Sequence, residues 1–138
     1  MTAPEMSKQD GDGAANPITG AILDAALEVH SALGPGLLEK VYRVCLAEEL
    51  RTRGHEVQEE VAAPVVYKGR RVEAGYRIDL LVDGRVIVEI KAVEETHPVH
   101  AAQLFTYLKL TNLQVSLLLN FNKRLMKNGI TRVVRSAG

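Results

Sequence analysis

The feature that most constrains the fold of this 138-residue chain is an Asp83-Gly84 dipeptide between two apolar runs. The runs cover residues 76–82 and 86–92 and are rich in β-branched and aliphatic side chains. An Asp-Gly pair flanked by such runs is the strongest short-range signal for a β-hairpin. We therefore expect two antiparallel strands here, within a single domain, because a chain of this length supports one hydrophobic core.

Ionisable residues interrupt both strands of this hairpin: Asp79 in the first, and Glu89 and Lys91 in the second. Glu89 and Lys91 are two residues apart, so they project from the same face of a strand. Such charges are costly to bury unless they pair with one another or bind a cation. One interpretation is a buried ion pair of Lys91 with either carboxylate. Because buried ion pairs stabilise less than apolar packing, we favour a divalent cation between the carboxylates.

The length of the hairpin loop decides whether Asp79 shares a face with Glu89. A two-residue turn would direct the Asp79 side chain to the opposite face. A three-residue loop of residues 82–84, with Gly84 in the left-handed conformation, would pair Asp79 with Ile87 and bring it to the face of Glu89. We expect such an odd-length loop or a bulge.

Hydrophobic periodicity predicts the other elements. Helices are expected at residues 17–33, 37–53 and 98–110, and strands at residues 57–67, 76–82, 86–92, 114–121 and 130–134. Pro64 lies within the first strand and favours an edge position or a bulge there. Residues 1–16 lack periodicity and are expected to form a disordered tail, which leaves residues 17–138 as the domain. The order ααβββαββ predicts an α/β protein of the α+β kind, with a mixed sheet of about five strands flanked by helices.

Charge is distributed unevenly along this formally neutral chain. Residues 97–138 contain no acidic residue and six basic ones, which are Lys109, Lys123, Arg124, Lys127, Arg132 and Arg135. This third of the chain could bind a polyanion. The alternative is that these charges simply lie on the solvated surface, as most surface charges do. The single Cys45 excludes an internal disulfide, and no signal peptide or membrane-spanning run is evident, so we expect a cytoplasmic protein without membrane contact.

Two predicted helices carry polar residues whose positions on the helix are informative. Glu39 lies on the apolar face of the second helix, one turn from Tyr42, where it could instead complement the helix dipole. On the third helix, Gln103 and Tyr107 are four residues apart and share a face.

These residues resemble the GxxExxY proteins, which are placed in the PD-(D/E)xK nuclease superfamily. The resemblance begins at Gly36-Leu-Leu-Glu39-Lys-Val-Tyr42 and continues through Tyr-Arg-Ile-Asp79 and Val-Glu89-Ile-Lys91. It extends through His100-Ala-Ala-Gln103-Leu-Phe-Thr-Tyr107 to Leu-Leu-Leu-Asn120-Phe121. It departs from the superfamily signature in having Ile78 where proline often precedes the aspartate. The resemblance implies a restriction-endonuclease-like core.

The resemblance also implies a catalytic set of Glu39, Asp79, Glu89 and Lys91. Asp79, Glu89 and the backbone carbonyl of Ile90 would hold Mg²⁺, or Mn²⁺ in its place, with Glu39 reaching it directly or through water. Lys91 would orient the attacking water or stabilise the developing negative charge. Tyr42, Gln103 and Tyr107 would support these residues or hold the substrate phosphate.

The expected function is therefore metal-dependent hydrolysis of nucleic acid, with DNA as the favoured partner and a homodimer as one possible assembly. The basic residues Lys109, Lys123, Arg124 and Lys127 are the candidates for binding its backbone. Two alternatives stay open. One is a catalytically silent module of the same fold that binds nucleic acid or assists assembly, and the other is an enzyme for a different phosphodiester.

Overall fold

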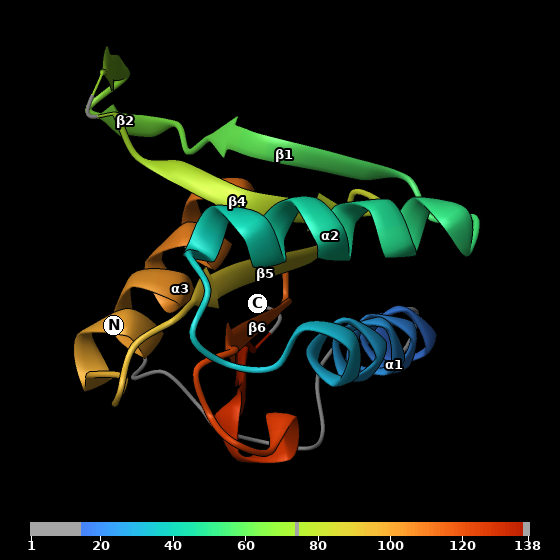
Figure 1. Ribbon diagram of the computed structural model, residues 1–138. Coiled ribbons are helices and arrows are strands. Elements are labelled where there is room, and N and C mark those ends of the chain that lie inside the picture. The colour runs from blue at the N-terminus through green and yellow to red at the C-terminus, as the bar shows by residue number, and fades with distance from the viewer. Residues whose placement is uncertain (1–14, 74, 137–138) are drawn as a thin grey trace.

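The computed structural model describes residues 15–73 and 75–136. Its centre is a five-stranded sheet with the strand order β1-β4-β5-β6-β7 (Figure 1). These strands are, in that order, Val57–Ala62, Arg77–Val82, Val86–Lys91, Val115–Asn120 and Ile130–Val134. Neighbouring strands are antiparallel except β5 and β6, which are parallel. The sheet is therefore mixed, as the sequence predicts.

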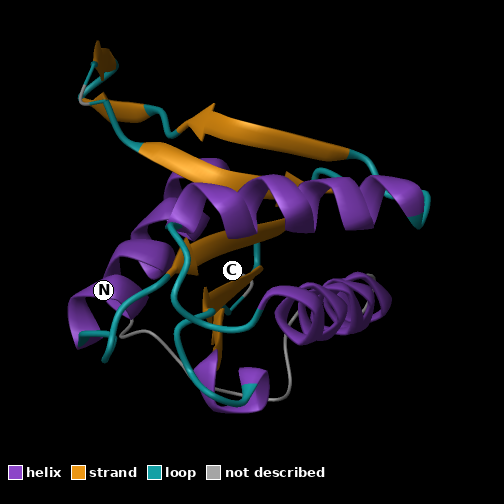
Figure 2. Ribbon diagram, viewed as in Figure 1, coloured by secondary structure: helices purple, strands orange, loops and turns teal. Residues whose placement is uncertain are grey.

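Helices cover both faces of this sheet (Figure 2). One buried cluster joins α1 (Asn16–Leu33) and α2 (Glu39–Thr52) to one face, and a second cluster joins α3 (Pro98–Thr111) to the other. The helix α3 connects the parallel strands β5 and β6, because such strands cannot be joined by a tight turn. In the described part of the chain, no helix is long and apolar enough to cross a membrane.

The strand predicted at residues 57–67 is divided, while the expected order ααβββαββ holds for the helices and the strands of the five-stranded sheet. It ends as β1 at Ala62, and the chain resumes after Pro64 as β2 (Val65–Tyr67). The strand β2 pairs with β3 (Arg70–Val72) in a small separate hairpin. Proline has no N–H to donate to a ladder, which accounts for the break at this point. The edge position expected for this segment is confirmed, because β1 is the outermost strand.

The odd-length loop between β4 and β5 is also confirmed, one residue later than expected. Val82 pairs with Val86, so the loop consists of Asp83, Gly84 and Arg85. Asp83 and Gly84 have positive φ values of 53° and 64°, and the Arg85 N–H donates to the Val82 carbonyl at 3.0 Å. Continued along the strands, this register places Asp79 opposite Glu89 instead of Ile87.

The first helix begins next to the expected domain boundary at residue 17. Asn16 is the first residue of α1, and the Ala15 side chain is buried in the core. The rest of the expected tail, residues 1–14, lies outside the described residues. Near the other end of the chain, the expected basic loop contains a short 3-10 helix, η2 (Met126–Gly129).

Candidate functional site

Asp79 and Glu89 meet where β4 and β5 separate. The backbone pairing of these strands ends at Leu80 and Val88. Beyond that point the Ile90 N–H donates to the Asp79 carboxylate at 2.8 Å, and the Asp79 N–H donates to Glu89 Oε1 at 3.4 Å. Side chains thus replace backbone partners at this point and hold the two acids against each other.

The backbone carbonyl of Ile90 lies on the same side of β5 as these carboxyls. In a strand, the N–H and C=O of one residue point in the same direction. The Ile90 N–H points to Asp79, whereas the neighbouring Lys91 carbonyl accepts a 2.9 Å bond from Phe121 on the β6 side. The Ile90 carbonyl therefore points away from β6, toward the Asp79 and Glu89 pair.

Burial of this pair raises the pKa of both acids. Glu89 is 7% exposed, and desolvation together with the charge of Asp79 raises its pKa to about 8. Desolvation also raises the pKa of Asp79, although its bonds to Ile90 and Glu89 and the charge of Lys91 oppose that effect. The negative charge of Glu39 raises the Asp79 pKa further. The charge of Lys91 therefore offsets only part of the effects that raise the two pKa values.

Lys91 and Tyr107 lie close enough to act on this pair electrostatically. The positive charge of Lys91 lowers the pKa of both acids and of His100. Tyr107 extends from α3 and is 4% exposed, and burial and the negative charge of Glu89 raise its pKa to about 12. The phenol is therefore a hydrogen-bond donor at neutral pH.

Glu39 is the first residue of α2, and its carboxylate accepts a bond from the Ala92 N–H at 3.4 Å. Tyr42, one turn later, is fully buried and stacks on Phe121 with ring centroids 4.6 Å apart. Its hydroxyl donates to the Gly34 carbonyl at 2.5 Å and accepts from the Leu37 N–H at 3.1 Å. Tyr42 therefore supports the site from the core, by holding the turn from which α2 and Glu39 begin.

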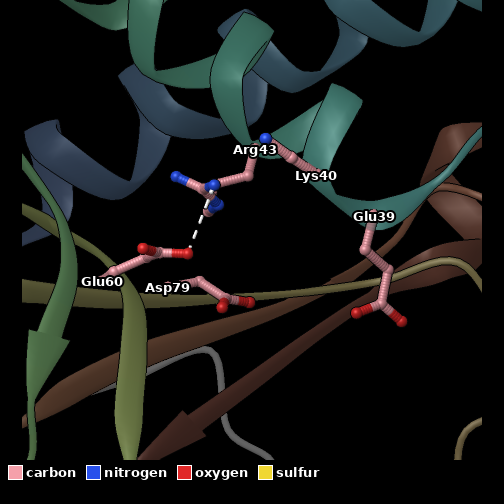
Figure 3. Close-up of a pocket in the computed structure, with 5 residues that line it drawn as sticks. All are labelled: Glu39, Lys40, Arg43, Glu60 and Asp79. Carbon is pink, nitrogen blue, oxygen red and sulfur yellow. Dashed lines mark ion pairs between the residues drawn. The ribbon is translucent and has the colours of Figure 1, made fainter.

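An open pocket of about 350 Å³ separates α2 from the edge of the sheet (Figure 3). It is lined by Glu39, Lys40, Arg43, Glu60 and Asp79. Arg43 reaches across it to Glu60 on β1, with 3.3 Å between Arg43 Nη2 and Glu60 Oε1. The Nη1 atom of Arg43 forms a second ion pair with Glu59. Glu60 has a φ of 52° and stands opposite Asp79, because its neighbours pair with Leu80 and Ile78.

Sequence reasoning missed three of these lining residues, namely Lys40, Arg43 and Glu60. A signal for Arg43 was present, because it follows Glu39 by four residues and so shares its helix face. No comparable signal marks Glu60, whose place depends on the pairing of β1 with β4. The pocket is thus bordered by two acids on the sheet, and by one acid and two basic side chains on α2.

Gln103 does not join the carboxylates in this pocket. It lies on α3, one turn before Tyr107, and lines a second groove with Tyr76 and Tyr107. Tyr107 is therefore the residue that connects the carboxylate pair with this groove.

None of the four basic residues expected to bind nucleic acid lines this pocket. Lys123 bonds the Glu94 carbonyl and the Glu95 carboxylate at 3.0 Å each, and Lys109 lies 6.0 Å from the Phe105 ring centre on α3. Arg124 and Lys127 are exposed around η2. Of this set, Lys123 is thus held by the segment that follows β5.

The donors at the β4–β5 junction fit a hard cation. Magnesium prefers oxygen ligands and keeps several waters, so two carboxylates and one backbone carbonyl are a sufficient protein contribution. Within residues 15–73 and 75–136, no group of three or more His, Cys, Asp or Glu side chains is arranged as a metal site. Asp79 and Glu89 are in contact, whereas Glu39 bonds the backbone at Ala92.

A family model described as the PD-(D/E)XK nuclease superfamily matches residues 16–133. The chain belongs to this superfamily. Its mixed sheet with flanking helices is the restriction-endonuclease-like fold, and PD-(D/E)XK proteins are typically nucleases that use divalent metals such as Mg²⁺. Searches of curated proteins and of solved structures gave no match.

Proposed function

We propose that residues 17–138 form a single metal-dependent nuclease domain that hydrolyses phosphodiester bonds, with DNA as the substrate and the cytoplasm as its location. The observation that carries this proposal is the buried contact between Asp79 and Glu89 beside Lys91. Two acids held together with raised pKa values are unfavourable for the fold by themselves. Such an arrangement is explained by a ligand that carries positive charge.

Asp79, Glu89 and the Ile90 carbonyl are the groups that would hold Mg²⁺ or Mn²⁺. When bound, such an ion neutralises charge on the phosphate and lowers the pKa of the water that attacks it. Glu39 borders the same pocket and would contribute through water. Because burial raises the pKa of both acids, binding of the ion would be accompanied by release of a proton from this pair.

The surrounding side chains would act directly on the substrate. Lys91 would orient the attacking water or stabilise the charge that develops on the phosphate oxygens. Lys40 and Arg43 would bind a neighbouring phosphate in the pocket that they line. Arg43 would exchange its partner Glu60 for that phosphate, because Glu60 is largely exposed and its ion pair is weak.

We also infer that the chain belongs to the GxxExxY branch of the superfamily. The residues of that motif act together here, since Tyr42 holds the turn that contains Gly36 while Glu39 faces the pocket. The glutamate and the tyrosine are thus linked by one helical turn of α2.

The test is cleavage of labelled single-stranded and double-stranded DNA and RNA in Mg²⁺, Mn²⁺ or EDTA. We expect cleavage only with metal, loss of cleavage in Asp79→Ala, and a loss of about a hundredfold or more in Lys91→Met with metal binding retained. Lys68→Met removes an exposed lysine from the β2–β3 turn and should cleave normally.

Two outcomes would contradict this assignment. Cleavage by Lys91→Met at the wild-type rate would remove the proposed role of the lysine. Binding of nucleic acid without metal-dependent cleavage of any probe would instead identify a catalytically silent binding module.

A further inference from the structure

A groove of about 310 Å³ lies beside the carboxylate pair, between α3 and the chain that enters β4. It is lined by Val65, Tyr76, Gln103, Thr106, Tyr107 and Leu110. Tyr107 lies between the groove and the carboxylate pair. Its side chain lines the groove, and the negative charges of Glu89 and Asp79 raise the pKa of its phenol. Whatever occupies the groove therefore lies next to the proposed site of hydrolysis.

The lining of this groove suits a flat aromatic ligand with polar edges. The rings of Tyr76 and Tyr107 are 6.3 Å apart at an angle of 55°, and Tyr76 is 49% exposed, so one ring is available for stacking. Val65 and Leu110 supply apolar walls. Gln103 supplies an amide, which can both donate to and accept from the edge of a base.

The same lining does not suit a phosphate group, which was one of the two roles expected for Gln103 and Tyr107 from the sequence. None of the six lining residues is basic, and a buried phosphate requires charged or converging N–H donors. The basic side chains of Lys40 and Arg43 line the other pocket. The aromatic groove thus suits the base of a nucleotide, and the pocket with Lys40 and Arg43 suits its phosphate.

We propose that this groove binds one unpaired nucleobase of the nucleic-acid substrate, stacked on Tyr76 and contacted at its edge by Gln103. The proposal rests on the nuclease function proposed above and extends it to the form of the substrate. A base within a duplex is stacked on both faces and paired at its edge, so it cannot enter a concave groove unless it leaves the helix. The enzyme therefore acts where a strand is single or locally unpaired.

The test measures binding in EDTA, where cleavage does not interfere. The probe is a fluorescein-labelled single-stranded DNA oligonucleotide that contains 2-aminopurine, and a second probe has an abasic site at the same position. Stacking on an aromatic ring quenches 2-aminopurine, so we expect quenching by the wild-type protein. Tyr76→Ala should abolish quenching and weaken binding by about 5- to 100-fold, as alanine substitution of stacking residues does elsewhere.

Three further variants make this test specific. Tyr76→Phe keeps the ring and should bind as the wild type does. Gln103→Ala should weaken binding of the base-containing probe more than binding of the abasic probe. Tyr67→Ala removes a tyrosine that is 65% exposed on β2, does not line the groove, and should leave binding unchanged.

The proposal is overturned if the wild-type protein does not bind the probe, if Tyr76→Ala binds it normally, or if Tyr76→Ala weakens binding of the abasic probe equally. Its failure is distinguishable from failure of the nuclease assignment. Metal-dependent cleavage with normal binding by Tyr76→Ala would leave the nuclease and remove the base groove. Quenching without cleavage of any probe would leave the groove and remove the nuclease.

Discussion

At the scale of single residues, Glu89 makes the protein sensitive to alkaline pH when no metal is bound. Its pKa rises from 4.5 in the unfolded chain to about 8 in the folded protein, through burial and the charge of Asp79. The folded state therefore holds a proton that the unfolded state has already released, so stability is lost as pH rises from 4.5 through 8. In EDTA, we expect the melting temperature to fall by on the order of 5 °C between pH 5 and pH 9.

Thermal unfolding of two matched variants checks this prediction. Glu89→Gln keeps the size of the side chain and removes the titrating group, so its melting temperature should depend less on pH. Glu28→Gln changes an exposed residue of α1 and should follow the wild type. An equal fall in Glu89→Gln would show that another group causes the effect.

At the scale of elements, Asn120 connects the end of β6 with the segment that follows β5. Its side chain is 2% exposed, accepts from the N–H groups of Val93 and Asn122 at 3.1 and 3.2 Å, and donates to the Val93 carbonyl at 2.8 Å. Asn120 pairs with Lys91 in the parallel ladder, so these bonds fix the end of the strand that carries the proposed catalytic lysine. We expect Asn120→Ala to lower the free energy of unfolding by about 2–4 kcal/mol, measured in urea, and to slow cleavage.

The control for this element is Asn128→Ala in η2. Asn128 is exposed, so its substitution should change the free energy of unfolding by no more than about 0.5 kcal/mol. Cleavage at the wild-type rate by a destabilised but folded Asn120→Ala protein would show that Lys91 does not depend on this connection.

At the scale of the whole molecule, metal binding should stabilise the fold, because Asp79 and Glu89 form the proposed site only when β4 and β5 are paired. A ligand at a hundred times its dissociation constant adds about 2.7 kcal/mol to a folded state that alone binds it. We expect Mg²⁺ or Mn²⁺ to raise the melting temperature by roughly 5–10 °C at pH 8. Asp79→Ala should lose this increase, whereas Asp24→Ala, an exposed change on α1, should retain it. An equal increase in Asp79→Ala would place the cation elsewhere.

The sequence by itself determined those features that depend on residues close together along the chain. The Asp83-Gly84 dipeptide predicts the hairpin, and the two-residue period of a strand puts Glu89 and Lys91 on one face. The need for Asp79 to share that face predicts an odd-length loop, which the structure contains. Pro64 lacks an N–H and so predicts an edge position or a bulge, and the strand before it, β1, is the outermost one.

What only the tertiary structure decided is the contact between segments that are distant along the chain. The pairing of β1 with β4 brings Glu60 opposite Asp79, and the packing of α2 over that edge makes Lys40 and Arg43 part of the pocket. The groove between Tyr76 and Gln103 likewise exists only after α3 packs on the sheet. Periodicity specifies which face of an element is apolar, but sheet twist and helix position specify which faces meet, and those depend on the whole core at once.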